Sequence, residues 1–325
     1  MKSLLKYSSN KLCVIIAVFL AGASASFCCQ AATYAYITNQ ASNDVSVIDA
    51  ESSKVIATIP VGKAPVGIAV SVMLNRVYIS NVDGKSISVI DSITNQVIEE
   101  LVINGSPVGL ALSPDSKVLY VADWYDDRVL AISTANLLDQ REISVGKAPA
   151  GMAVSPDGKT LYVANRDSND IAVIDTAALT ISTRINVGKH PFGLALNQDG
   201  SALYAVNVQS NTLSVINTST HLTDTIKVGD HPYCVTVSSN GKYAYVTNTQ
   251  DDSVSVIDVS ANKAITKIKV GEVPEGISFD AINQKIYVAN WGSNSVSVID
   301  ATSNQLIKSI STGQQSRAFG QFIYQ

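Results

Sequence analysis

Short hydrophobic runs alternate with polar turns along the chain after residue 32, and one of these runs recurs at a nearly constant interval. Each copy begins with a tyrosine, continues with small or β-branched residues, and ends in asparagine or aspartate. Successive tyrosines are 42 residues apart, with a single interval of 41. Such a period indicates a repeat architecture in which each copy is one structural unit. The copies are Tyr36-Ile37-Thr38-Asn39, Tyr78-Ile79-Ser80-Asn81, Tyr120-Val121-Ala122-Asp123, Tyr162-Val163-Ala164-Asn165, Tyr204-Ala205-Val206-Asn207, Tyr245-Val246-Thr247-Asn248 and Tyr287-Val288-Ala289-Asn290.

The order of signals within each unit predicts four antiparallel strands. In the fourth unit, apolar runs lie at 151–155, 161–165, 171–175 and 181–188, separated by turn formers such as Ser-Pro-Asp-Gly. Short runs of β-branched and aromatic residues between such turns are typical of strands. Both faces of these strands are apolar, so neighbouring units must cover both sides of each sheet. We therefore predict an all-β fold, a seven-bladed β-propeller with four antiparallel strands per blade.

The ends of the repeat region predict how the ring closes. The first unit starts at its tyrosine strand near Thr33 and lacks the strand that precedes the tyrosine in every other unit. The segment from Arg317 to Tyr324 supplies a strand of that kind at the far end. We expect the C-terminal strand to join the N-terminal blade, because this pairing removes exposed sheet edges. The seven repeats account for residues 33–325, which we predict to be a single propeller domain.

Residues 1–32 have the pattern of a signal peptide. They contain a basic start at Lys2, Lys6 and Lys11, an apolar run at 12–25, and possible cleavage sites after Ala25, Ala31 or Ala32. The apolar run is short for a membrane span, which needs roughly 20 residues. We expect an exported protein without a membrane span in the mature chain, and the periplasm, the cell surface and the extracellular medium all stay open as destinations.

Charge and cysteine content narrow the classes of partner. The net charge is −4, and the lysines are scattered rather than gathered in a basic stripe, so we expect no nucleic-acid partner. If cleavage follows Ala31 or Ala32, Cys234 is the only cysteine left, and the fold gains no disulfide. We expect a monomer stabilised by packing between its blades.

Several motifs together resemble the YVTN family of β-propeller repeat proteins. These are the tyrosine run, the Val-Ser-Val-Ile-Asp run, the turn at 155–159 and the link Val-Gly-x-x-Pro-x-Gly, and they cover the whole of 33–325. The resemblance implies a propeller fold. It leaves several functions open, because similar propellers include surface-layer components, binding proteins and dehydrogenase-associated proteins, and related ones include lactonases and a streptogramin lyase.

Comparison of the repeats separates scaffold from candidate site. Positions shared by all blades are predicted to be structural: the tyrosines pack between blades, and the terminal Asn or Asp bonds the backbone of the adjoining turn. With strands A to D counted outward in each blade, the B-to-C and D-to-A loops open on one face. The A-to-B and C-to-D turns open on the other face, where uniform Ser-Pro-Asp-Gly turns make a site improbable.

The B-to-C and D-to-A loops differ from blade to blade and supply the candidate residues. We predict a ligand- or partner-binding surface at the channel mouth, because aromatic residues and arginine commonly dominate binding energy. A purely structural interpretation also exists: solvated histidines, a rim ion pair and tryptophans that cap the core. The predicted binding residues are Trp124, Tyr125, Arg166, His190, Phe192, His231, Tyr233, Glu275, Trp291 and Arg317.

Two alternatives use the same surface. His190, His231 and Cys234 could bind Zn or Cu in a metal-binding or redox-associated propeller, although no short-range ligand motif supports such a site. A lactonase-like hydrolase or lyase would use His190, His231 or Glu275 as general acid or base, with Arg317 stabilising an oxyanion. The sequence contains no Gly-x-Ser-x-Gly nucleophile motif and no Cys-x-x-Cys-His haem motif. We therefore favour a binding module without catalytic activity, with no evident cofactor.

Overall fold

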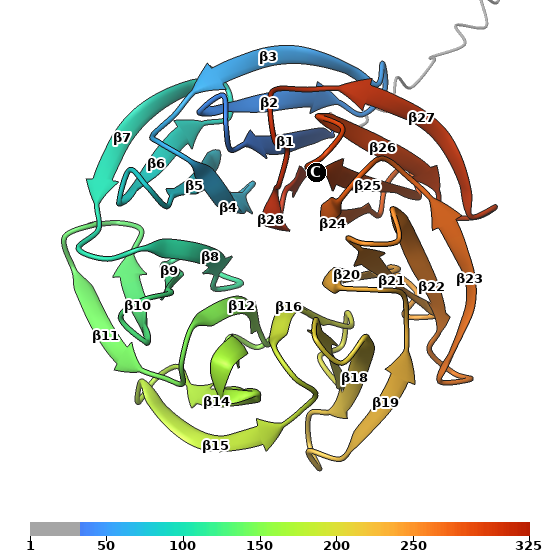
Figure 1. Cartoon of the computed structure of the whole chain (residues 1–325). Coiled ribbons are helices and arrows are strands. Elements are labelled where there is room, and N and C mark those ends of the chain that lie inside the picture. The colour runs from blue at the N-terminus through green and yellow to red at the C-terminus, as the bar shows by residue number, and fades with distance from the viewer. Residues whose placement is uncertain (1–32) are drawn as a thin grey trace, which may run out of the picture. The chain divides into compact units, whose positions relative to one another are not determined.

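A computed structural model describes residues 33–325, which form seven antiparallel sheets arranged as the blades of a ring (Figure 1). This confirms the predicted seven-bladed β-propeller. In blades 2 to 7 the chain proceeds from an innermost strand A to an outermost strand D, and in blade 1 the innermost strand comes from the C-terminus. Figure 1 shows β3, β7, β11, β15, β19, β23 and β27 on the outside of the ring. The one short helical segment among the described residues is the 3-10 turn Arg166–Ser168.

The strands of blades 1 to 4 are these. Blade 1 holds β29 (Ile323–Tyr324), β1 (Tyr34–Asn39), β2 (Asp44–Asp49) and β3 (Lys54–Pro60); blade 2 holds β4 (Pro65–Ser71), β5 (Arg76–Asn81), β6 (Ser86–Asp91) and β7 (Gln96–Val102); blade 3 holds β8 (Pro107–Leu112), β9 (Val118–Asp123), β10 (Arg128–Ser133) and β11 (Gln140–Ser144); blade 4 holds β12 (Pro149–Val154), β13 (Thr160–Asn165), β14 (Asp170–Asp175) and β15 (Thr180–Asn186).

The strands of blades 5 to 7 follow the same order. Blade 5 holds β16 (Pro191–Leu196), β17 (Ala202–Asn207), β18 (Thr212–Asn217) and β19 (Thr223–Lys227); blade 6 holds β20 (Pro232–Val237), β21 (Tyr243–Asn248), β22 (Ser253–Asp258) and β23 (Lys263–Lys269); blade 7 holds β24 (Pro274–Asp280), β25 (Lys285–Asn290), β26 (Ser295–Asp300) and β27 (Gln305–Ser311). The remaining strand, β28 (Phe319–Gln321), lies beside β4.

Burial along the strands explains the sequence pattern. Strands B and C, such as β5 and β6, are buried at almost every position because a blade packs against each face. The outermost strands β3 and β15 alternate between exposed and partly buried residues, because one edge of each blade meets solvent. The apolar runs and the alternating runs therefore mark the inside and the outside of the ring.

The repeated tyrosines and asparagines hold the positions predicted for them. Tyr36 is fully buried, and its hydroxyl donates a hydrogen bond to Asn95 Oδ1 in the next blade at 3.3 Å. The Asn165 side chain accepts a hydrogen bond from the Gly146 N–H at 3.0 Å and donates one to Asp170 Oδ1 at 2.7 Å. These contacts join each blade to its neighbour and each D-to-A link to the blade that follows it.

The ring closes at the C-terminus as predicted. Strand β29 pairs antiparallel with β1, with Tyr324 opposite Tyr34, and so completes blade 1. The preceding β28 adds a second connection, because it pairs parallel with β4, with Phe319 opposite Gly67. Within β28, Gly320 has φ +129°, a conformation that favours glycine. One continuous segment thus joins blades 1 and 2 at the centre of the ring.

No helix among residues 33–325 is long and apolar enough to cross a membrane. The predicted signal peptide and its cleavage sites after Ala25, Ala31 or Ala32 lie outside the described residues.

Candidate functional site

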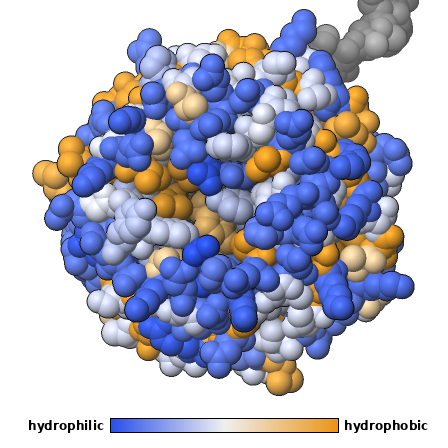
Figure 2. Space-filling model, viewed as in Figure 1, coloured by the Kyte–Doolittle hydropathy of each residue, from blue (hydrophilic) through white to orange (hydrophobic). Residues whose placement is uncertain are grey.

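The D-to-A links and the B-to-C loops share one face of the ring, as predicted. The N–H of Val82, in a B-to-C loop, donates to the Ala64 carbonyl of a D-to-A link at 3.1 Å, and Arg166 N–H donates to Ala148 O at 3.1 Å. We call this face the mouth face. We call the opposite face, which carries the A-to-B and C-to-D turns, the turn face. Figure 2 shows one face of the ring, hollowed at its middle.

One position of each D-to-A link faces the channel centre: the residue after the proline, or after Ser316 in the link to blade 1. In blades 2 to 4 this residue is small, and in the other blades it is large, so the large side chains extend across the channel towards the small ones. In ring order, beginning at blade 2, the residues are Val66, Val108, Ala150, Phe192, Tyr233, Glu275 and Arg317.

Four aromatic side chains close the channel at the mouth face. The ring centroid of Phe192 lies 4.3 Å from that of Tyr233, 4.8 Å from that of Phe319 and 5.9 Å from that of Trp124. Phe192 and Phe319 are buried. We call these four residues the aromatic plug. Tilted aromatic pairs at such distances stabilise the fold beyond their buried area.

A polar network lies against the plug. Arg317 Nε is 2.5 Å from Glu275 Oε2, Nη2 is 2.6 Å from the Tyr233 hydroxyl, and Nη1 is 3.2 Å from Gln40 Oε1. Trp291 Nε1 donates to the same Gln40 oxygen at 3.3 Å. The side chains of Arg317 and Glu275 are only 19% and 10% exposed. We call these five residues the arginine network.

Burial and charge together hold the side chains of the arginine network in contact with one another. Burial raises the pKa of the Glu275 carboxyl, and the Arg317 guanidinium opposes that shift. Burial alone would lower the pKa of Arg317, but Tyr233 and Glu275 outweigh it and raise that pKa. Arg317 is therefore held protonated, with every guanidinium nitrogen engaged. Neither it nor Glu275 is available as a free acid, base or oxyanion donor in this arrangement.

The rim of the mouth face is more exposed than the plug. The Arg166 guanidinium carbon lies 5.8 Å from the centre of the Trp124 ring, and Arg166 Nη1 is 2.6 Å from Asp167 Oδ1. Tyr125, next to Trp124, is 76% exposed. The predicted aromatic and charged residues thus divide into the plug with its network, which include the half-buried Trp124 and Trp291, and a more exposed rim of Tyr125 and Arg166.

The two mouth-face histidines occupy a turn position rather than a convergent site. His190 and His231 have φ of 55° and 49°, and Ala64 and Ala148 adopt nearly the same φ, 54° and 52°, at the equivalent position. The His190 N–H donates to Asn169 Oδ1 at 2.9 Å, so the backbone is held by a side chain of the preceding turn. Because alanine adopts nearly the same φ at the equivalent position, the turn does not require a histidine side chain.

The predicted metal ligands are not assembled into a three-ligand site. In the part of the chain that the structure describes, no three His, Cys, Asp or Glu side chains gather closely enough to hold a metal ion, and this includes His190, His231 and Cys234. Cys234 is buried and faces the channel interior, and its burial raises the pKa of the thiol well above the usual range.

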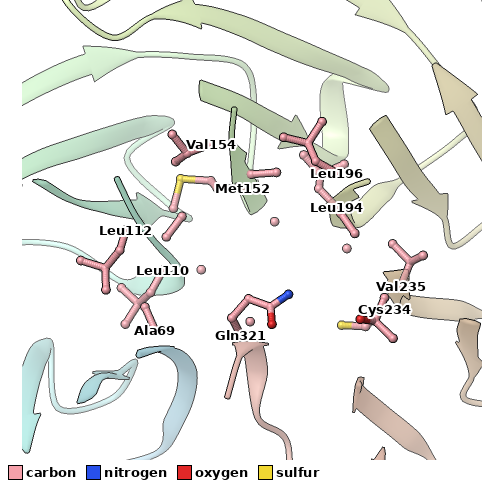
Figure 3. A pocket seen from close by; sticks show the side chains of 18 of the residues that line it. Ala69, Leu110, Leu112, Met152, Val154, Leu194, Leu196, Cys234, Val235 and Gln321 are labelled. Atoms are coloured by element: carbon pink, nitrogen blue, oxygen red, sulfur yellow. The ribbon is translucent and has the colours of Figure 1, made fainter. Parts of the chain in front are cut away.

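Comparison of the seven repeats did not identify three features of the channel. Gln40 and Phe319 were not predicted as site residues, although Gln40 lies in a B-to-C loop and Phe319 in the closing strand. A cavity of about 480 Å³ also reaches the turn face, where the uniform turns argued against a site (Figure 3). Its walls are the apolar A strands, which look like ordinary core in the sequence.

Comparison with known proteins agrees with this geometry. The family model described as lactonase, 7-bladed beta-propeller, matches residues 131–236 and 216–319, which together span more than half of the chain. No curated protein matches the sequence.

Solved structures share the fold at low sequence identity. Hydrazine synthase from Kuenenia stuttgartiensis is 23% identical, with a TM-score of 0.73 over 82% of this chain and 91% of that one. A protein of unknown function from Desulfotomaculum acetoxidans is 13% identical, with a TM-score of 0.74 over 88% and 99%. Dihydro-heme d1 dehydrogenase NirN in complex with DHE is 14% identical, with a TM-score of 0.68 over 90% and 74%. At these identities the likeness concerns the fold alone. The family match and the seven-bladed ring agree with the resemblance to YVTN propellers, and the chain belongs to the lactonase family of seven-bladed β-propellers.

Proposed function

We propose that this protein is an exported binding module whose mouth face captures a partner protein. The observation that carries the proposal is the pairing of guanidinium groups with aromatic rings around the plug. Arg166 lies over Trp124 at 5.8 Å, and Arg317 lies over Tyr233 at 5.9 Å. Tryptophan, tyrosine and arginine are the residue types that dominate binding energy at protein interfaces.

The plug and the rim have different roles in this proposal. Phe192, Tyr233 and Phe319 are packed together, so they form a rigid base that loses little conformational freedom on binding. The exposed Tyr125 and the neighbouring Trp124 and Arg166 make the direct contacts with the partner. His190 and His231 border this surface on their D-to-A links. The signal-peptide pattern at 1–32 supports a partner in the periplasm, on the cell surface or outside the cell.

Affinity capture from an envelope extract tests the role of the rim. The wild-type protein is compared with a Tyr125→Ala, Arg166→Ala double variant, and Leu138→Ala on the turn face is the matched control for an exposed side chain. We expect the double variant to retain less than a tenth of the proteins that the wild type and the control retain, since interface hot spots each contribute about 2 kcal/mol or more. Equal capture by all three would contradict the proposal.

Family membership supports a second candidate, hydrolysis of a lactone at the same mouth. Glu275 would act as the acid or base and Arg317 would stabilise the developing negative charge, which requires that substrate first separates their ion pair. Hydrolysis of a panel of lactones by the wild type and by Glu275→Gln, with folding checked by circular dichroism, distinguishes the candidates. Turnover that disappears in a folded Glu275→Gln variant favours the hydrolase. Absence of turnover by the wild type favours the binding module, and turnover that is unchanged in Glu275→Gln excludes Glu275 as the acid or base.

A further inference from the structure

The central cavity lies between the aromatic plug and the turn face. Its walls come from the A strands of blades 2 to 7 and from β28, and Figure 3 shows side chains surrounding a common space. Phe319 lines the cavity and also packs on Phe192, so the plug forms its floor. The other end passes the turn residues Pro114, Pro156 and Asn197. The cavity is therefore a pocket entered from the turn face, separate from the mouth surface.

The lining favours an uncharged ligand with an apolar body. Leu110, Met152, Leu194 and Val235 supply hydrocarbon and thioether surface, and no residue that lines the cavity carries a charged side chain. An ion transferred into such a space would lose its hydration without gaining a partner. The volume of about 480 Å³ lies within the usual range of small-molecule pockets, about 300 to 1,000 Å³.

Polar side chains also line this space, namely Ser113, Ser116, Asn197, Thr236 and Gln321, and the longest of them, Gln321, is exposed to solvent there. Gln321, on β28, extends towards the middle of the cavity in Figure 3. The Ser278 hydroxyl donates to its Oε1 at 3.0 Å, which fixes the amide and directs Nε2 to the cavity side. The hydroxyl of Ser113 and the amide of Asn197, at the entrance, bond to their own turns instead. The Gln321 amide thus offers a placed donor to a ligand with a hydrogen-bond acceptor.

Two departures from the repeat occur at this cavity. Blades 2 to 5 and blade 7 place glycine after Pro-x, whereas blade 6 places Cys234, whose side chain lines the cavity (Figure 3). The A-to-B turn of blade 2 is also apolar: Val72, Met73 and Leu74 stand where blade 3 has Pro-Asp-Ser and blade 4 has Pro-Asp-Gly, and Met73 is 67% exposed. This turn follows Val70, which lines the cavity. The entrance therefore has apolar surface beside it that the repeat itself does not require.

We propose that the cavity binds a small, neutral, mostly hydrocarbon molecule with a carbonyl oxygen that accepts a hydrogen bond from Gln321. Leucine, valine and methionine side chains surround the body of the ligand, and the amide orients its polar end. The site uses none of the exposed rim residues of the mouth face, so it is independent of partner capture there.

Fluorescence titration with prodan, a neutral naphthyl ketone whose emission moves to the blue in apolar surroundings, tests the site. We expect saturable binding of one prodan per chain. Leu194→Trp fills the cavity and should weaken binding more than tenfold, whereas Leu138→Trp, an exposed leucine on a C-to-D turn, should not change it. Gln321→Leu removes one hydrogen bond and should weaken binding about 2- to 10-fold, compared with no change for the exposed Gln314→Leu.

Two results would overturn the proposal: no saturable blue shift with the wild-type protein, or equal affinity in Gln321→Leu and Gln314→Leu. The comparison of Gln321→Leu with Gln314→Leu tests the proposal even if Leu194→Trp fails to fold. Tyr125→Ala should bind prodan normally, so a failure of partner capture at the mouth face and a failure of this site give different results.

Discussion

The two ends of the central channel are made by the same A strands and differ in almost every other respect. At the mouth face, large side chains from blades 5 to 7 and from the closing segment cross the axis and fill it with aromatic rings and an ion pair. At the turn face, leucine, valine and methionine side chains leave a pocket of about 480 Å³. The repeat thus fixes the backbone of the A strands, whereas the side chains at the two ends of the channel can differ.

The glycines that follow Pro-x in the A strands lie at the boundary between these ends, and we call them the glycine ring: Gly67, Gly109, Gly151, Gly193 and Gly276. A methyl group at Gly193 would lie 2.6 Å from the Tyr233 carbonyl oxygen, so the A strands approach each other too closely there for most side chains. Cys234 is the one such position in blades 2 to 7 with a larger residue. Close packing at the ring keeps the two ends separate, and a change at one end should have little effect on the other.

The largest expected effect comes from breaking the buried ion pair at the closed end. Arg317→Ala leaves Glu275 buried without its partner and also removes the bonds to Tyr233 and Gln40. We expect the free energy of unfolding to fall by about 3 to 5 kcal/mol, measured by chemical denaturation. Replacing both residues by leucine should recover part of this loss, because no uncompensated charge then remains. A loss below about 1 kcal/mol for Arg317→Ala would show that solvent already reaches the pair.

A matched pair of truncations compares the two ends directly. Phe192→Ala removes a ring that contacts Trp124, Tyr233 and Phe319, and should cost about 3 to 5 kcal/mol. Leu194→Ala removes a side chain that lines the open pocket, and should cost less than about 2 kcal/mol because part of that side chain faces the cavity and is not packed against other atoms. Thermal and denaturant unfolding measure both. Equal losses would mean that the turn-face end is packed as tightly as the plug.

The fold could be predicted almost completely from the sequence, because the tyrosine period is repeated seven times and each copy reports the same packing. The mouth cluster could be located because its residues depart from the repeat at Phe192, Tyr233, Glu275 and Arg317. Their mutual contacts could not be predicted, since they join residues up to 277 positions apart, such as Gln40 and Arg317.

The cavity could not be found in this way, for a different physical reason. Its lining residues, such as Leu110 and Leu194, follow the same apolar pattern as filled core, and a pattern of hydrophobic residues does not say whether the space between them is filled. The histidines are the opposite case: His190 stands out in the sequence, but its backbone adopts a turn conformation that alanine also adopts at the equivalent position.

The reactivity of the Cys234 thiol tests how closely the channel is packed between its two ends. Because burial raises its pKa, little thiolate is present near pH 8, and we expect alkylation by iodoacetamide at least tenfold slower than that of a free cysteine. The rate should climb as the pH increases towards the raised pKa. Peptide mass spectrometry that follows Cys234 alone measures the rate. Modification at the rate of free cysteine would place the thiol in open solvent and would contradict the close packing of the ring.

The smallest effect is expected at the tyrosines between the blades, which lie away from both ends. Burial raises the pKa of Tyr245 to about 12. Because this pKa is raised on folding, the stabilisation is complete below the ordinary tyrosine pKa of about 10 and is lost as the pH rises through about 12. Tyrosinate absorbance and stability against pH, measured on the wild type and on Leu194→Ala, should give the same alkaline transition. A shifted transition in the variant would show that the pocket and the blade interfaces are coupled.

Crystals pressurised with xenon test most directly whether the channel is closed at one end and open at the other. Xenon occupies dry apolar cavities. We predict xenon density in the pocket between Leu110, Leu194 and Phe319, and none among the rings of Phe192, Tyr233 and Trp124. Xenon within the aromatic plug, or a pocket without xenon and filled instead by repacked side chains, would contradict the division of the channel into a sealed mouth and an apolar binding pocket.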